Sequence, residues 1–358
     1  MNNNLYVVLM AGGVGTRFWP YSRNARPKQY LDVLGTGKTL LQSTCDRFLP
    51  LCPKENILVV TNEEHGAITR EQLPQLHPSQ ILTEPMRKNT APCIAYASRK
   101  IFAQNPHAIM VVSPSDHLIM NEAEFQNTIH SAAEFANSKD NLITLGIKPT
   151  RPETGYGYIQ FIEGASSIKK VKTFTEKPEL QLAKTFLESG DFVWNAGIFI
   201  WSVKAIMDAF AAHLPEMAEI FDEAAPHINT VNEREAIRQA YAQCKSISID
   251  YGIMEKARNV FVALSTFDWS DLGSWASLHD VSKKDAQNNL VNADALVYET
   301  RNSVIKGPKD KLIVAQGLNG YLVGVFDNVV IVCEKDKEEQ FRKFVNDVKA
   351  KPNGADYL

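Results

Sequence analysis

Three glycines and two basic residues near the start of the chain are spaced as a phosphate-binding loop requires. Gly12, Gly13 and Gly15 follow a short apolar run, and Arg17 and Lys28 come soon after them. Glycine allows backbone N–H groups to approach a ligand closely, and cations complement phosphate oxygens. An apolar strand that ends in such a loop predicts a cradle for phosphate groups.

Two common phosphate motifs fit this segment poorly. The dinucleotide-binding fingerprint requires a third glycine where Phe18 stands, and the following Trp19-Pro20 opposes an immediate long helix. The Walker A motif matches at residues 37–39, but Asp32 occupies the position of its first glycine. The sequence therefore disfavours a Rossmann dehydrogenase, and residues 37–39 are interpreted as a turn before a helix.

A second polar segment covers residues 84–93, after a short strand. Thr90 suits a helix N-cap and Pro92 suits the first helical turn. Capping does not explain residues 87–89, Arg-Lys-Asn, which could meet a base, ribose or phosphate. For Asn89 the two explanations stay open.

Two aspartates come after apolar strands and are candidates for holding a metal ion. Asp116 follows the strand-like residues 108–113, and Asp271 comes in a loop after the strand-like residues 260–264. Mg²⁺ prefers carboxylate and phosphate oxygens. Asp268 is a rival ligand, and Asp116 could instead form an Asx turn or cap the next helix.

A third group of residues could form a sugar-phosphate site. Backbone beside Gly157, the carboxylate of Glu176 and the amide of Asn195 suit hydroxyl groups, and Lys177 suits a phosphate. Each has an ordinary alternative, such as an exposed ion pair for Glu176 and Lys177. Asp250 is interpreted as the cap of a short helix.

The first half of the chain alternates strand-like and helix-like segments, which predicts a mostly parallel sheet with helices on both faces. Ligands of such sheets bind beyond the carboxyl ends of the strands. Strands are expected at residues 5–10, 57–61, 81–83, 108–113 and 142–147, and helices at 40–48, 63–72, 91–103 and 122–136.

Composition narrows the class of protein. The 358 residues suit one large and one small domain, and a net charge of −3 gives no overall attraction to nucleic acid or anionic membrane. The five cysteines lack CxxC spacing, which argues against a zinc site. No signal peptide or membrane-spanning run is recognised, so a cytoplasmic enzyme is expected.

These motifs together resemble the sugar-phosphate nucleotidylyltransferases, and among them the bacterial mannose-1-phosphate guanylyltransferases. They follow the order of that family over about the first 275 residues. Phe18 and Tyr30 stand where many relatives have Leu and Phe, and both stay apolar. The resembling segments are residues 11–17, 19–20, 27–29, 84–85, 88–92, 113–117, 155–159, 174–178, 194–201, 248–257 and 268–275.

The resemblance implies a Mg²⁺-dependent reaction of GTP with mannose 1-phosphate that gives GDP-mannose and diphosphate. It implies catalytic roles for Arg17, Lys28 and Lys177, and Mg²⁺ ligation by Asp116 and Asp271. The nucleotide would be held by Ala11, Gly12, Gly13, Gly15, Thr16, Arg17, Lys28, Pro85 and Asn89, and the sugar phosphate by Gly157, Glu176, Lys177 and Asn195.

The resemblance also implies the domain organisation. Residues 1–283 would form a Rossmann-like nucleotidyltransferase domain with a mixed, mostly parallel sheet. Residues 284–358 would form a small left-handed β-helix-like domain, used for contacts in a homodimer. The chain carries no His/Glu metal cluster of the kind that a cupin-type isomerase domain would need after this point.

Two alternatives stay open at this stage. The enzyme could use another base or another sugar, because no residue decides between them from first principles. The fold could also serve as a sugar-nucleotide sensor without turnover, although Lys28, Asp116 and Lys177 are all present.

Overall fold

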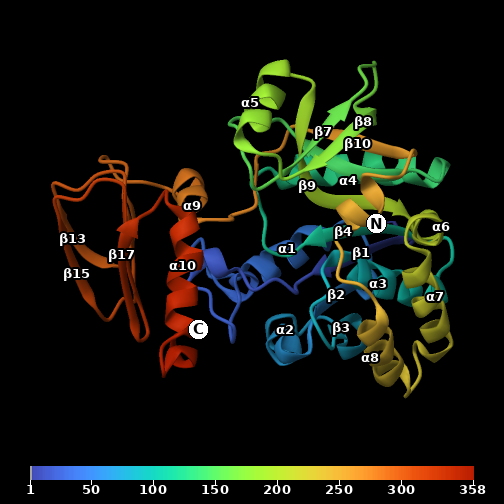
Figure 1. Cartoon of the computed structure of the whole chain (residues 1–358), viewed down its shortest axis with the longest axis horizontal. Coiled ribbons are helices and arrows are strands. Elements are labelled where there is room, and N and C mark those ends of the chain that lie inside the picture. Colours follow the sequence, from blue (N-terminus) through green and yellow to red (C-terminus); the bar gives the residue numbers. More distant parts are fainter. Residues whose placement is uncertain (1) are drawn as a thin grey trace. The chain divides into compact units, whose positions relative to one another are not determined.

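The computed structural model describes residues 2–358, apart from the side chains of residues 338 and 339, and divides into two compact units (Figure 1). The larger unit comprises residues 1–12, 44–115 and 119–269, and the smaller comprises residues 13–43, 116–118 and 270–358. One boundary therefore falls inside the glycine loop, between Gly12 and Gly13. The smaller unit contains more than residues 284–358, and the domain boundary expected after residue 283 stays a prediction.

The larger unit is built on a nine-stranded mixed sheet with the order β3-β2-β1-β4-β9-β6-β10-β8-β7. The strands β3, β2, β1 and β4 pair in parallel, and β9 is antiparallel to both β4 and β6. A mixed sheet is thus confirmed. The expectation that it is mostly parallel is wrong, because of the described strand pairs four are parallel and five are antiparallel. The strands are β1 (Leu5–Met10), β2 (Ile57–Asn62), β3 (Ile81–Glu84), β4 (Ile109–Pro114), β6 (Leu142–Ile147), β7 (Gly157–Phe161), β8 (Ile168–Glu176), β9 (Phe192–Ser202) and β10 (Val260–Ser265).

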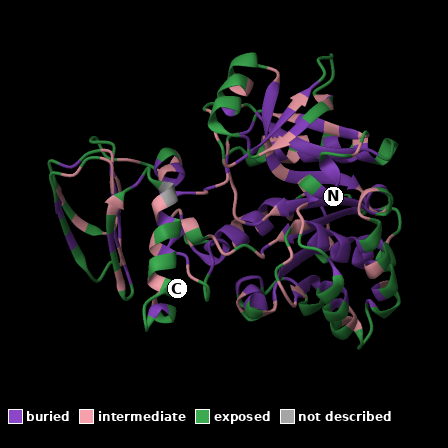
Figure 2. Ribbon diagram, viewed as in Figure 1, coloured by how far each residue is buried: buried purple, intermediate pink, exposed green. Residues whose placement is uncertain are grey.

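Helices of this unit cover both faces of the sheet. On one face, side chains of the central strands pack with α3, α6, α7 and α8 in one buried cluster, and on the other α4 packs on β4, β6, β9 and β10. Figure 2 shows buried strands between helices whose outer sides are exposed. The helices are α1 (Leu40–Phe48), α2 (Gly66–Gln72), α3 (Thr90–Gln104), α4 (Glu122–Ser138), α5 (Leu180–Ser189), α6 (Val203–His213), α7 (Pro215–Ala224) and α8 (Glu233–Gln243).

Parallel pairing brings the carboxyl ends of β1 and β4 to one edge of the sheet. Val7 and Val8 of β1 lie opposite Val111 and Val112 of β4. The amide and hydroxyl of Ser115 both donate to the carbonyl of Met10, at 3.1 and 2.9 Å. The glycine loop and the segment that carries Asp116 therefore leave the sheet side by side.

The smaller unit contains two parallel strand ladders. β12, β14 and β16 pair in parallel, β17 adds to β16 antiparallel, and β13 pairs in parallel with β15. Its chain alternates between the two ladders, as in the coils of a β-helix. The elements are η1 (Thr16–Phe18), η2 (Lys28–Tyr30), α9 (Trp275–Val281), β12 (Leu290–Asn292), β13 (Asp294–Tyr298), β14 (Val304–Lys306), β15 (Leu312–Gln316), β16 (Tyr321–Phe326), β17 (Val329–Glu334) and α10 (Glu338–Lys349).

A buried tryptophan centres the core of the smaller unit. Trp275 is fully buried, and its ring lies 5.0 Å from that of Phe18, 6.3 Å from that of Tyr21 and 5.8 Å from that of Phe326. Aromatic contacts of this kind add to the free energy of apolar burial. The segment after the glycine loop is thus packed into the same core as the C-terminal strands.

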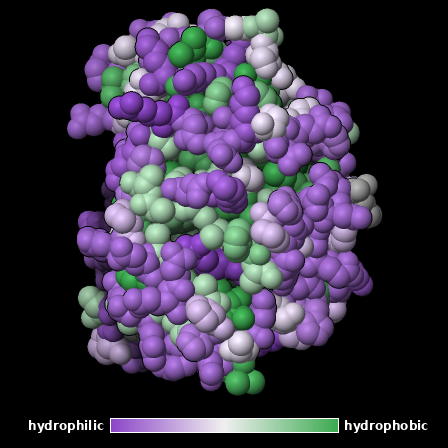
Figure 3. All heavy atoms as spheres, turned by 90° about the vertical axis from the view of Figure 1, so that its right-hand side faces the viewer, coloured by the Kyte–Doolittle hydropathy of each residue, from purple (hydrophilic) through white to green (hydrophobic). Residues whose placement is uncertain are grey.

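Most of the expected elements are found within one or two residues of their predicted ends. The expected helix at residues 63–72 begins as a 3₁₀ turn (Glu63–His65) before α2. None of the helices in the described part of the chain is long and apolar enough to cross a bilayer. Hydrophilic residues cover most of the face of the molecule that Figure 3 shows.

Candidate active site

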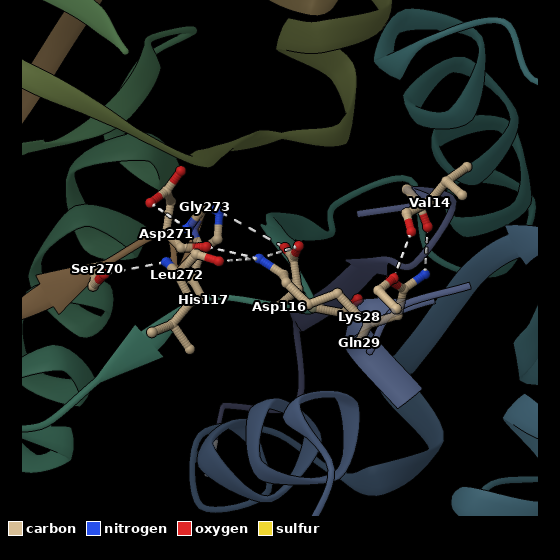
Figure 4. A network of polar contacts seen from close by, with 12 residues as sticks. Val14, Lys28, Gln29, Asp116, His117, Ser270, Asp271, Leu272 and Gly273 are labelled. Atoms are coloured by element: carbon tan, nitrogen blue, oxygen red, sulfur yellow. Dashed lines mark hydrogen bonds and ion pairs between the residues drawn. The ribbon is translucent and has the colours of Figure 1, made fainter. Parts of the chain in front are cut away.

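A buried lysine of the smaller unit joins three segments of the chain (Figure 4). The Lys28 ammonium donates to the carbonyls of Asp271, at 2.8 Å, and Leu272, at 3.1 Å, and pairs with Asp116 Oδ2 at 2.8 Å. Lys28 is only 4% exposed. An ammonium has three N–H groups, so these contacts engage all of them. Lys28 therefore holds both predicted metal ligands in place.

The carboxylate of Asp116 is kept ionised by its neighbours. Burial acts to raise its pKa, but the Lys28 ammonium, His117 and a hydrogen bond from Lys28 hold that pKa below its ordinary value. His117 Nε2 lies 3.8 Å from Asp116 Oδ1. His117 therefore lies beside the carboxylate, and Asp116 offers a hard oxygen of the kind that Mg²⁺ prefers.

Asp271 lies in a tight turn whose backbone holds its carboxylate in a fixed orientation. The turn residue Leu272 is buried and has a φ of 45°, a conformation that a leucine rarely adopts. Asp271 Oδ1 accepts a hydrogen bond from the amide of Gly273 at 2.9 Å, and a side chain at Gly273 would overlap this carboxylate. Backbone strain of this kind is found most often at functional sites.

Asp271 and its rival Asp268 have different main-chain partners, and the choice between them as a metal ligand stays a prediction. Lys28 bonds the main chain of Asp271, whereas the carbonyl of Asp268 accepts from the amide of Met120 in the larger unit. The expectation that Asp116 caps the following helix is wrong, because the side chain of Asn121 caps α4.

The glycine loop needs glycine at residue 15 for two reasons. Gly15 has a φ of 64° and starts the short helix η1, which contains Thr16 and Arg17. A Cβ atom there would also lie 2.7 Å from Cβ of Lys28. A side chain at this position would therefore strain the backbone and displace Lys28.

Two carbonyl groups of this loop accept hydrogen bonds from side chains, whereas the amides of the same two residues remain available to a ligand. Ser22 Oγ donates to the carbonyl of Val14, and Gln29 Nε2 to that of Gly13, both at 2.9 Å. Within residues 2–358, the amides of Gly13 and Val14 donate to no carbonyl. A phosphate group could accept from such amides.

The larger unit contributes a buried carboxylate that sequence reasoning missed. Glu84 ends β3 and accepts a hydrogen bond from the Tyr241 hydroxyl at 2.7 Å. Burial raises the pKa of Glu84 to about 7. A Cβ atom at Gly12 would lie 3.1 Å from Glu84 Oε2, so glycine lets the backbone pass close to this carboxylate. Ala11, just before Gly12, is buried.

The start of α3 differs from the expectation. Asn89, not Thr90, is the N-cap: it has a φ of 69°, and its side chain accepts from the amide of Thr90. Thr90 Oγ1 instead accepts from the amide of Ile249 at 2.9 Å. Pro85 is half-buried and Asn89 is exposed, and their roles with a nucleotide stay predictions.

The four residues predicted to bind the sugar phosphate lie together in the larger unit. Gly157 pairs with Glu176 across β7 and β8, and a side chain at Gly157 would overlap the Glu176 carboxylate. The Lys177 ammonium lies 2.6 Å from Glu176 Oε1 and its side chain is 55% exposed. A Cβ atom at Gly157 would lie 3.3 Å from Cβ of Asn195.

Asn195 is held by hydrogen bonds on both sides of its amide. Its Oδ1 accepts from Thr144 Oγ1 at 2.8 Å and from the amide of Gly197 at 3.1 Å. Its Nδ2 donates to Asp250 Oδ1 at 2.9 Å. Asn195 therefore has one N–H left for a ligand, and it also orients Asp250.

Asp250 is a second carboxylate that sequence reasoning misplaced. It opens a π-helical turn (Asp250–Met254) but gives it no side-chain cap. Burial, and then the charge of Glu176, raise the pKa of Asp250 to about 7. π-helical turns are rare and are frequent at functional sites, but the sequence of this turn alone did not reveal one.

Comparison with known proteins shows the family of this chain. Residues 6–288 match the family model of nucleotidyl transferases. A mannose-1-phosphate guanylyltransferase of Escherichia coli is 35% identical over 352 residues, which cover 96% of this chain and 74% of the relative. The xanthan biosynthesis protein XanB of Xanthomonas campestris pv. campestris (strain B100) is 37% identical over 350 residues, which cover 96% and 73%.

A solved structure shares the fold over nearly the whole chain. It comes from Thermus thermophilus and is described as a mannose-1-phosphate geranyltransferase. It superposes with a TM-score of 0.88 at 31% identity, and the match covers 97% of this chain and 100% of that chain.

The Lys28 network should contribute strongly to stability. We expect Lys28→Met to lower the free energy of unfolding by about 3 kcal/mol, because it leaves a partly buried carboxylate and two carbonyls without their partner. The double variant Lys28→Met/Asp116→Asn should lose less than the sum of the two single losses. Urea unfolding measures all three. Lys343→Met, an exposed site of the same unit, is the control, and a Lys28→Met variant as stable as this control would contradict the prediction.

Asp250 should make stability depend on pH. Its pKa is about 7 in the folded chain against an ordinary 3.8, so the unfolded chain loses its proton first as the pH rises. The stability that protonated Asp250 contributes is therefore full below about pH 4 and lost by about pH 7. Asp250→Asn keeps the shape of the neutral carboxyl group. Its free energy of unfolding relative to wild type should increase by about 1 kcal/mol or more when the pH is raised from about 5 to about 8.

Thermal unfolding at the two pH values measures this gain in Asp250→Asn. The exposed carboxylate of Asp208, which pairs with Lys204 on the surface of α6, provides the control variant Asp208→Asn. If the stability of the two variants relative to wild type increased equally between the two pH values, Asp250 would not titrate as described.

Proposed function

The chain belongs to the nucleotidyl transferase family, and on that premise we propose that it makes GDP-mannose from GTP and mannose 1-phosphate. The observation that carries the proposal is the Lys28 network beside Gly15, in which the ammonium binds the Asp116 carboxylate and the main-chain carbonyl of Asp271. Relatives that are named mannose-1-phosphate guanylyltransferase, of whose length this chain covers 74%, support the choice of substrates.

The reaction requires no covalent intermediate. A phosphate oxygen of mannose 1-phosphate attacks the α-phosphorus of GTP, a new P–O bond forms, and the bond from the α-phosphorus to the β-phosphate oxygen breaks. That electron pair leaves with diphosphate. A sugar phosphate is already anionic at neutral pH, so no general base is needed. The protein's task is to orient two anions and to offset their repulsion.

We assign the triphosphate to the loop that contains Gly12, Gly13 and Gly15. The amides of Gly13 and Val14 support this assignment, because no carbonyl of the described chain occupies them. Arg17 follows on η1 and would add a positive charge. Lys28 would contact a phosphate only by exchanging one of its three present partners, so we propose that it acts mainly by holding Asp116 and the Asp271 turn.

Asp116 and Asp271 fit a Mg²⁺ ion. Both offer hard oxygen atoms, both are tied to Lys28, and the pKa of Asp116 is held low. No group of three or more potential ligands exists among the described residues, so phosphate oxygens and water would complete the shell, as Mg²⁺ prefers. A bound Mg²⁺ would neutralise charge on the phosphates and on the departing diphosphate.

The sugar phosphate is assigned to the cluster in the larger unit. Backbone at Gly157, the Glu176 carboxylate and the remaining N–H of Asn195 suit sugar hydroxyls, and the exposed Lys177 suits the phosphate. Asp250 was not foreseen, and its oxygen that does not bond Asn195 would add a further group for a hydroxyl.

Finer features of the organisation remain our proposals. We propose that the two parallel ladders form a left-handed β-helix and that the protein is a cytoplasmic homodimer. An apolar outer face on β13 and β15 supports the dimer, because Leu296, Tyr298, Leu312 and Val314 are all exposed there. Apolar faces of this kind mark contact surfaces.

Diphosphate release tests the proposed reaction. GTP, ATP, UTP and dTTP are each combined with mannose 1-phosphate or glucose 1-phosphate, with and without Mg²⁺. We expect Mg²⁺-dependent release with GTP and mannose 1-phosphate alone. Release of diphosphate with another pair would contradict the proposed substrates and would still support the proposed type of reaction. No release from folded protein that still binds a nucleotide would favour the sensor.

Lys177 should matter for the sugar phosphate and little for stability. We expect Lys177→Gln to lower kcat/KM for mannose 1-phosphate by about 10²-fold, because a charge on the reacting phosphate is lost, and to leave Tm unchanged, because the side chain is exposed. Lys172→Gln removes an exposed charge of the same strand and should keep wild-type kinetics. Equal kinetics in both variants would remove Lys177 from the site.

A further inference from the structure

A large hollow in the smaller unit is lined by none of the residues proposed for the substrates. It has a volume of about 1100 Å³ and is formed by the segment from Pro20 to Gly37, the turn from Gly307 to Lys311 and the end of β16. Sites for small metabolites commonly occupy several hundred Å³. The hollow has room for such a ligand.

The hollow is positively charged in a chain whose net charge is −3. Five cations line it against three carboxylates. One of these carboxylates, Asp32, accepts hydrogen bonds from the amides of Thr36 and Gly37 at 2.9 and 2.8 Å, so part of its charge is already used. The cations are Arg23, Arg26, Lys306, Lys309 and Lys311.

Lys306 is the buried member of this group. It is 6% exposed, its ammonium donates to the carbonyl of Val33 at 3.2 Å, and it lies 4.6 Å from the centre of the Tyr21 ring. Within residues 2–358 it forms no ion pair, and burial lowers the pKa of Lys306 to about 8. The Asp32 carboxylate opposes this shift, but a buried ammonium with no carboxylate within ion-pair distance is still costly. An anion in the hollow would add a compensating charge.

The other cations could meet an anion from several sides. Arg23 is held in place, because its guanidinium donates to the carbonyls of Pro20 and Phe326, both at 3.2 Å. Lys309 and Lys311 are exposed on the turn between β14 and β15. Cations from separate segments suit an anion with several charged oxygens better than a single carboxylate.

We propose that this hollow is a binding site for a small phosphate-bearing metabolite, separate from the site of nucleotidyl transfer. Lys306 and Arg23 form its fixed part, and the exposed Lys309 and Lys311 supply further charge at its rim. The site goes beyond the proposed function and does not depend on which nucleotide and sugar the enzyme uses.

Isothermal titration calorimetry with 2,3-bisphosphoglycerate and with inorganic phosphate, with and without GTP, tests the proposal. We expect one bisphosphoglycerate per chain, bound whether or not GTP is present. Lys309→Gln/Lys311→Gln should weaken binding by about ten-fold or more, because two charge-assisted contacts are lost. The control Lys343→Gln/Lys351→Gln removes the same charge from exposed positions of the same unit and should bind as wild type does.

Three results would overturn the proposal. They are no binding of either probe, displacement of the bisphosphoglycerate by GTP, or an equal loss in the control variant, which would show general attraction to the surface. Lys306→Met should abolish binding, and the exposed lysine pair decides the question if that variant does not fold. Loss of transferase activity in the substrate tests would leave these measurements unaffected.

Discussion

The organisation of the smaller unit's site depends on one buried ammonium. Lys28 bonds two carbonyls of a strained turn and the carboxylate of Asp116, so residues 28, 116 and 271–272, distant in the sequence, have a common centre. Burying a charge is unfavourable unless it is paired and hydrogen-bonded, and here every N–H of the ammonium has an acceptor. Gly15 is required beside it, because a larger residue would displace the Lys28 side chain.

The parallel pairing of β1 with β4 in the larger unit explains why the glycine loop and the segment with Asp116 begin at neighbouring strand ends. β1 and β4 pair in parallel, so the glycine loop and the segment with Asp116 emerge at one edge, and Ser115 ties the two strand ends. Antiparallel strands carry the residues assigned to the sugar phosphate. Glu176 lies on β8 and Asn195 on β9, and β7 pairs with both strands, so Gly157 lies between them. Strand pairing therefore brings together part of each cluster, and the segments after the strands carry its other side chains.

Local patterns in the sequence were sufficient for what depends on local chemistry. Apolar runs bounded by turn residues located the strands, and glycines beside cations indicated the loop to which we assign the phosphates. Two carboxylates could not be assigned in this way. The environment of Glu84 depends on a hydrogen bond from Tyr241, which is distant in the sequence. The environment of Asp250 depends on a hydrogen bond from Asn195, on another element of the larger unit. The helix cap also moved from Thr90 to Asn89, because Thr90 receives a hydrogen bond from Ile249, a contact that no local pattern encodes.

The pKa values of three carboxylates are shifted in opposite directions, and this suits a reaction between two anions. The Lys28 ammonium holds the pKa of Asp116 below its ordinary value, and the proposed role as a metal ligand requires an ionised carboxylate. Burial brings the pKa values of Glu84 and Asp250 to about 7, so a large fraction of each carries a proton near neutral pH. A protonated carboxyl group donates a hydrogen bond and adds no negative charge. If the substrates bind where we propose, acidic side chains near their phosphates would thus cause less repulsion than ionised ones.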